Sequence, residues 1–214
     1  MYEFEQAARL EGYAAVCGVD EAGRGPLAGD VYAAAVILPP GLELAGVNDS
    51  KKLSEKRREA LYGVITEQAA AWCVASASVE EIERLNILQA SLLAMRRAVE
   101  GLGVRADFAL VDGNRDPHFE GVPCKTIVGG DGKSASVAAA SILAKVTRDR
   151  YMEQLAARYP QYGFERHKGY GTQAHREALL KYGPCPVHRK LFLRRRGRRA
   201  RGHTARTRRG LRAA

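Results

Sequence analysis

The stretch AAVCGVDEAGRGP, residues 14–26, runs from a hydrophobic segment through two acids into a turn rich in glycine. Residues 14–19 are short and apolar, as expected of a buried strand, and Asp20 and Glu21 follow at once. The glycines and proline after them end regular structure. A second apolar run at 31–38 is stopped by two prolines and a glycine, so the two runs predict an antiparallel pair of strands.

The rest of the chain alternates between short apolar runs and longer stretches with helical character. Strands are expected at 72–79, 108–111 and 125–128, and helices at 53–71, 80–101, 136–159 and 172–182. Ser54 is the expected N-cap of the first helix. This order predicts an α/β fold in which helices flank one mixed, five-stranded sheet.

Composition excludes two broad classes of protein. Hydrophobic residues make up 46% of the chain, yet no apolar run approaches the roughly 18 residues that a membrane helix needs. The first ten residues carry two glutamates and lack the apolar core of a secretory signal. The cysteines are widely scattered, unlike zinc-binding or disulfide frameworks. These features predict a cytoplasmic protein with reduced cysteines and no membrane partner. The four cysteines are Cys17, Cys73, Cys124 and Cys185.

The net charge of +10 is confined to one end of the chain. Residues 194–214 contain ten arginines and no acid, and the remaining 24 basic residues equal the 24 acidic ones in number. We therefore expect a catalytic domain at 1–193 and a disordered, arginine-rich tail at 194–214. Binding of nucleic acid by the domain must then be argued from individual residues.

Acidic residues follow three of the expected strands. Asp20 and Glu21 follow the first, Asp112 follows the fourth, and Asp131 follows the fifth, each with glycine close behind. Taken singly, an aspartate there is more often a turn residue or a helix cap, and Asp131 lies just before a helix. The repeated pattern is better explained by side chains that converge at the carboxyl ends of neighbouring strands.

Several carboxylates in one place repel each other, and a bound divalent cation removes that conflict. Oxygen ligands suit magnesium or manganese, so Mg²⁺ or Mn²⁺ is the expected cofactor. Two such ions about 3.5–4 Å apart can activate water and stabilise the leaving oxygen of a phosphodiester. This predicts phosphodiester hydrolysis by a two-metal mechanism.

Several motifs resemble those of the type 2 ribonuclease H family, ribonuclease HII. The likeness covers roughly residues 12–190, and the motifs occur in the family's order. They are VDEAGRGP at 19–26, NDSKKL at 48–53, VDG at 111–113, GD at 130–131, AAASILAKVTRD at 138–149 and HKGYGT at 167–172.

The resemblance implies a ribonuclease H-like fold with Asp20, Glu21, Asp112 and Asp131 as catalytic metal ligands. It implies cleavage of the RNA strand of RNA/DNA hybrids and incision at ribonucleotides embedded in duplex DNA, leaving 5′-phosphate and 3′-hydroxyl ends, with a part in ribonucleotide excision repair. No obligate protein partner is expected.

The resemblance also assigns residues to substrate binding. Gly23, Arg24 and Gly25 would sense the ribose 2′-hydroxyl, and glycine lets a backbone approach that closely. Tyr170 would pack on the sugar at the RNA–DNA junction, although a tyrosine between two glycines is by itself an ordinary loop residue. Lys51 would contact phosphate, as would Lys145.

The C-terminal part departs from the family pattern. Lys190-Leu191 stands after His188-Arg189 where the family has a serine–phenylalanine pair, and the arginine tail has no counterpart. His167, His175 and His188 show no spacing that pairs them for acid–base chemistry, so packing or surface roles are expected. Two alternatives stay open. One is a DNA nuclease of the same superfamily, and the other is a non-enzymatic protein that binds nucleic acid through its tail.

Overall fold

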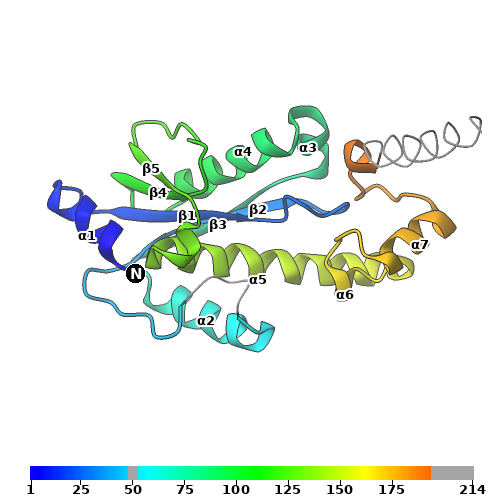
Figure 1. The fold of residues 1–214 in the computed structure, drawn as a ribbon, viewed down its shortest axis with the longest axis horizontal. Helices are drawn as coiled ribbons and strands as arrows, with labels where there is room; N and C mark the ends of the chain where they lie inside the picture. The colour runs from blue at the N-terminus through cyan, green and yellow to red at the C-terminus, as the bar shows by residue number, and fades with distance from the viewer. Residues whose placement is uncertain (48–52, 194–214) are drawn as a thin grey trace, which may run out of the picture.

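A computed structural model describes residues 1–47 and 53–193, and the helix and strand labels are those of Figure 1. Its centre is a five-stranded sheet in the order β3-β2-β1-β4-β5. The strands are β1 (Val16–Ala22), β2 (Val31–Ile37), β3 (Ala71–Ala77), β4 (Phe108–Asp112) and β5 (Cys124–Ile127). The first three pair antiparallel, whereas β4 lies parallel to both β1 and β5. The expected α/β fold with a mixed sheet is confirmed.

Helices cover both faces of this sheet (Figure 1). One face carries α3 (Val79–Leu85) and α4 (Ile87–Glu100), and the other carries α2 (Glu55–Gln68) and the long α5 (Ala135–Arg158). Two separate hydrophobic layers result, one between the sheet and α4 and one between the sheet and α5. The remaining helical elements are α1 (Glu3–Leu10), η2 (Gly130–Gly132), η3 (Pro160–Tyr162), α6 (Phe164–His167) and α7 (Gln173–Tyr182).

The packing of α5 on β1 depends on Gly18. A Cβ atom at this position would lie 2.1 Å from the backbone carbon of Ser136 and 2.2 Å from the nitrogen of Val137. Only glycine lets the helix backbone come this close to the strand. Because Gly18 and Asp20 are two residues apart in the strand, they share the face that α5 covers. The close approach thus brings Asp20 under α5.

The prediction of a single helix at 80–101 is wrong. Two helices meet at Asn86, whose φ of 73° lies in the left-handed region and breaks the helical path. Asn86 then caps α4 by accepting hydrogen bonds from the backbone N–H groups of Leu88 and Gln89. Helix α1 was not expected at all. Ser54 does cap α2, as expected, accepting from the N–H of Arg57 at 3.3 Å.

No helix in residues 1–47 or 53–193 is long and apolar enough to span a bilayer. The arginine-rich segment 194–214 lies outside the described residues, so the expectation of a disordered tail stays a prediction.

Candidate active site

Three of the four expected acids lie at the carboxyl ends of adjacent parallel strands. The register of β1 with β4 pairs Val19 with Val111, so Asp20 and Asp112 are the next residues along their strands. Both follow positions whose side chains face α4, and alternation turns both aspartates toward α5. They line one pocket of about 210 Å³ together with Glu21.

Asp20 is the acid most strongly affected by its surroundings. Its side chain is buried, and burial raises its pKa well above the usual value, as do the charges of Glu21 and Asp112. A hydrogen bond from the Ser141 hydroxyl and one from the N–H of Glu21 act in the opposite direction. The site therefore stores like-charge repulsion that a cation would relieve.

Asp131 is buried in η2, directly after the last strand, and does not line the pocket of the other three acids. Its neighbour Gly130 donates its N–H to the Asp112 carboxylate at 2.7 Å, which ties this turn to the end of β4. The N-cap of α5 is Ser134, which accepts from the N–H of Val137 at 3.3 Å. The alternative reading of Asp131 as the cap of that helix is therefore wrong.

The glycine-rich turn and Tyr170 lie on the other side of the same pocket, although 145 positions separate Gly25 from Tyr170. A Cβ atom on Gly25 would be 3.5 Å from the Cε1 atom of the tyrosine ring, an ordinary van der Waals distance. Gly23 has a φ of 99°, and a Cβ there would lie 2.0 Å from Nε of Arg148. The structure thus brings Asp20, Glu21 and Asp112 together with the residues expected to sense ribose.

Arg189 determines the shape of this turn. Its fully buried guanidinium donates to the carbonyls of Gly23 at 2.7 Å, Arg24 at 3.1 Å and Pro26 at 3.0 Å. In a trans peptide the C=O and the following N–H point in opposite directions. The N–H groups of Arg24 and Gly25 therefore face away from Arg189.

Sequence reasoning missed this role for Arg189, because the residue lies 166 positions from Gly23. Burial and the nearby Arg148 guanidinium lower the pKa of Arg189 to about 9. Arg148 is buried too, and it donates to the carbonyls of Ala28, Asp30 and Lys168. Two positive charges therefore lie beneath the turn.

The two expected phosphate-binding lysines have different outcomes. Lys51 lies outside the described residues, as does most of the motif around it. Lys145 lines the pocket and forms an ion pair with Asp149 at 2.7 Å. Burial lowers the pKa of Lys145, and the Asp149 carboxylate opposes that shift.

The histidines are closer together than their spacing indicated. Nε2 of His175 lies 3.0 Å from Nε2 of His188, and the His167 ring stacks on His175 with centroids 4.5 Å apart. His175 and His188 are buried, and neither lines the acidic pocket. The expected packing role fits this arrangement.

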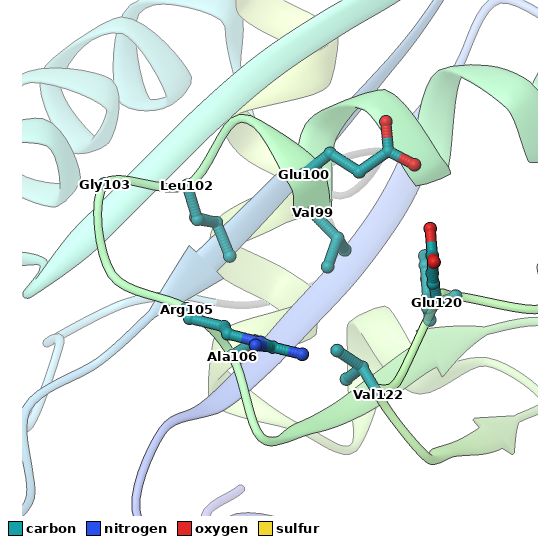
Figure 2. A pocket seen from close by; sticks show the side chains of 9 residues that line it. Val99, Glu100, Leu102, Gly103, Arg105, Ala106, Glu120 and Val122 are labelled. Carbon is teal, nitrogen blue, oxygen red and sulfur yellow. The ribbon is translucent and has the colours of Figure 1, made fainter.

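A larger hollow of about 560 Å³ lies at the amino ends of β4 and β5, opposite the acids (Figure 2). Its lining combines apolar side chains such as Val99 and Leu102 with three charged ones, Glu100, Arg105 and Glu120. Its lining residues include two glutamates beside an arginine but no group of three acids, so the carboxyl-end pocket is the better candidate for chemistry.

The donor atoms of the acidic pocket suit a hard divalent cation, because they would be carboxylate oxygens. The charges of Glu21 and Asp112 repel the Asp20 carboxylate, and a cation would offset this repulsion. Within the described ranges, no three histidine, cysteine, aspartate or glutamate side chains already form a complete metal-binding group. Glu21 is currently engaged by the Arg24 guanidinium at 3.3 Å. Rotation of side chains would be needed to complete a cation site.

The chain is similar to proteins of one family. The sequence model of the family described as Ribonuclease HII matches residues 17–195. A ribonuclease HII from Dechloromonas aromatica is 63% identical over 177 residues, 83% of this chain and 90% of the relative. One from Neisseria meningitidis serogroup C is 59% identical over 175 residues, 82% of this chain and 90% of the relative. The crystal structure of ribonuclease H2 from Pyrococcus horikoshii has a TM-score of 0.70 at 27% identity, covering 83% of this chain and 93% of that one.

Proposed function

The chain belongs to the ribonuclease HII family, and from this we propose that it hydrolyses the RNA strand of RNA/DNA hybrids and incises duplex DNA at embedded ribonucleotides. It is a ribonuclease H and therefore a metal-dependent hydrolase. One observation carries the finer proposal. The carboxylates of Asp20, Glu21 and Asp112 share a pocket with the Gly23–Gly25 turn and Tyr170, so chemistry and ribose recognition can act on the same nucleotide.

Asp20, Glu21, Asp112 and Asp131 are the proposed ligands of Mg²⁺ or Mn²⁺. When bound, two such ions supply positive charge that activates water and stabilises the departing oxygen. Ser141 orients Asp20 through its hydroxyl, and the N–H of Gly130 orients Asp112. The burial of Asp20 strengthens its interaction with any cation, because water screens charges less in such a place.

Ribose recognition rests on the direction of the backbone in the glycine-rich turn. With the carbonyls of Gly23 and Arg24 bound by Arg189, the N–H groups of Arg24 and Gly25 are free to point at a 2′-hydroxyl. That hydroxyl is the group by which a protein distinguishes RNA from DNA. The Tyr170 ring borders the same space and is 45% exposed, so it can contact a sugar.

Hydrolysis by water leaves a 5′-phosphate and a 3′-hydroxyl, and these are the product ends that we propose. Attack by the 2′-hydroxyl itself would leave a cyclic phosphate and would require an acid–base pair at the scissile bond. The buried histidines His175 and His188 do not line the pocket, so they are not placed for that reaction.

The decisive experiment compares three duplexes: an RNA/DNA hybrid, a DNA duplex with one ribonucleotide, and an all-DNA duplex. Each is incubated with Mg²⁺, with Mn²⁺ and with a chelator. We expect cleavage of the first two only with metal, and 3′-hydroxyl ends. Cleavage of the all-DNA duplex would instead indicate a DNA nuclease of the same superfamily. Binding without turnover, unaffected by Asp20→Asn, would indicate a non-enzymatic binding protein.

We place this activity in the cytoplasm and in ribonucleotide excision repair. All four cysteines are free, which agrees with a reducing compartment. No obligate protein partner is proposed, and the substrates are the hybrid and the DNA duplex with embedded ribonucleotides.

A further inference from the structure

Three histidines lie directly behind the loop that carries Tyr170. His167 ends α6, His175 is in the first turn of α7, and His188 follows α7 in the C-terminal segment. We call these three residues the histidine cluster. The proposed acidic site does not use them, yet their hydrogen bonds lead to the backbone on either side of Tyr170.

The proton positions in the buried pair follow from its hydrogen bonds. The backbone N–H of Cys185 donates to Nδ1 of His188 at 3.0 Å, so the ring proton of His188 is on Nε2. That Nε2–H then donates to Nε2 of His175 at 3.0 Å. His175 therefore carries its own proton on Nδ1, which donates to the carbonyl oxygen of Tyr170 at 2.9 Å.

His167 reaches the other side of the same loop. The backbone N–H of Gly169 donates to Nδ1 of His167 at 3.3 Å, and Nε2 of His167 donates to the carbonyl of Tyr162 at 2.8 Å. Its ring stacks on His175 with an interplanar angle of 12°. Imidazole rings thus bind the Lys168–Gly169 peptide on one side of Tyr170 and the peptide that follows Tyr170 on the other.

Tyr170 is 45% exposed, so packing covers only part of its side chain and the position of its backbone matters for where the ring lies. A binding group works best when its surroundings fix its position in advance. We propose that the histidine cluster is a positioning device for Tyr170, which fixes the loop backbone so that the ring faces the pocket beside Gly25. This inference rests on the proposed reading of a ribonucleotide junction by Tyr170.

The arrangement requires neutral rings. Every ring uses one nitrogen as donor and the other as acceptor, so a second proton would set two N–H groups against each other. Burial lowers the pKa of His188 to about 4 and also lowers the pKa of His175. At neutral pH the hydrogen-bond chain is therefore intact.

Two variants at His175 test the proposal. His175→Leu fills the space but removes the donor, whereas His175→Asn keeps an N–H near the position of Nδ1. We expect His175→Leu to lower kcat/KM on the single-ribonucleotide duplex about tenfold relative to the hybrid, the effect of one buried hydrogen bond. His175→Asn should stay within about twofold of the unmodified chain in this ratio. Equal losses on both substrates would overturn the proposal.

A double-mutant cycle with Tyr170→Ala separates positioning from general stability. If His175 acts through Tyr170, His175→Leu should not change the substrate ratio further once the tyrosine is absent. A further change of the same size in that background would overturn the positioning role. If the unmodified chain fails to cut at an embedded ribonucleotide, the proposed function fails and this inference with it. If it cuts there and Tyr170→Ala selectively impairs it, while His175→Leu does not, only this inference fails.

A measurement on the unmodified chain keeps the test independent of folding of the variants. Long-range ¹H–¹⁵N correlation spectra of the labelled protein at neutral pH report which imidazole nitrogen carries the proton. We expect His175 protonated on Nδ1, and His167 and His188 on Nε2. Charged rings, or a mixture of tautomers at His175, would overturn the proposal.

Discussion

Alanine substitution at Gly23 should mainly lower stability, whereas alanine substitution at Gly25 should mainly lower activity, although the two glycines belong to one turn. Gly23 has a φ of 99°, a conformation that costs a residue with a side chain about 1–3 kcal/mol. Its new Cβ would also lie 2.0 Å from Nε of Arg148. Displacing that buried guanidinium weakens its bonds to three backbone carbonyls, each worth about 1 kcal/mol.

The two costs lower the free energy of unfolding of Gly23→Ala by about 4 kcal/mol in total. Domains of ordinary stability have about 5–15 kcal/mol, so this variant should fold but unfold at much lower urea concentration. Gly25→Ala meets only the Tyr170 ring at 3.5 Å and should change stability by about 0.5 kcal/mol or less. Its methyl group occupies the space between the turn and Tyr170, so cleavage at ribonucleotides should fall sharply.

Urea unfolding and steady-state cleavage of the single-ribonucleotide duplex measure the two effects. Gly63→Ala is the matched control, since this glycine is within α2 and a Cβ there has open space around it. It should gain up to about 1 kcal/mol in stability and keep full activity. Full activity of Gly25→Ala would refute close approach of the turn to ribose. Unchanged stability of Gly23→Ala would refute the role of Arg148 beneath it.

Three further predictions concern charge. Asp20→Asn should nearly abolish turnover, yet raise the free energy of unfolding in chelator by about 1 kcal/mol, because it removes a buried, repelled carboxylate. It should also lose the stabilisation by Mn²⁺, about 2.7 kcal/mol at 100 times Kd for an intact site, and calorimetry showing undiminished stabilisation would contradict ligation. His188 has a folded pKa of about 4 against 6.5 unfolded, so the folded state binds fewer protons. Neutral His188 should therefore contribute about 3 kcal/mol to the free energy of unfolding above pH 6.5, and this contribution should be lost as the pH falls to 4. His188→Asn should flatten the dependence of the free energy of unfolding on pH in that range. Truncation after Leu193 should preserve the cleavage site but weaken duplex binding and reduce its salt dependence, and an unchanged salt slope would show that the tail does not contribute.

The sequence predicted the sheet well because its signals are local. Most strands are apolar runs ended by acid, glycine or proline, and all five were expected within about three residues of their observed ends. The break at Asn86 was missed, because apolar residues at helical spacing, such as Leu85, Leu88 and Leu92, continue through it and only the φ of one residue divides the helix. Helix α1 was missed because a short amphipathic segment has no capping signal at Tyr2.

The candidate site was predicted in part. Asp20, Glu21 and Asp112 share a pocket because they end or nearly end adjacent strands, a consequence of order along the chain. Their role as metal ligands stays a prediction, and so does that of Asp131. Arg189 could not be found this way, because it contacts the carbonyl of Gly23, 166 positions earlier in the chain. No spacing rule connects residues across such a separation.

We therefore expect the C-terminal segment to influence selectivity more than its distance along the chain from the acids indicates. Arg189 fixes the carbonyls of the glycine-rich turn, and the adjacent His188 acts through His175 on the loop of Tyr170. The acids, in contrast, belong to strands whose packing against α5 needs neither residue. The residues proposed for the chemistry and those proposed for ribose recognition thus have separate structural supports that meet at one pocket. A substitution at 188–189 should for this reason alter the choice of substrate before it alters the cleavage reaction, because the strand ends that carry Asp20 and Asp112 stay in place.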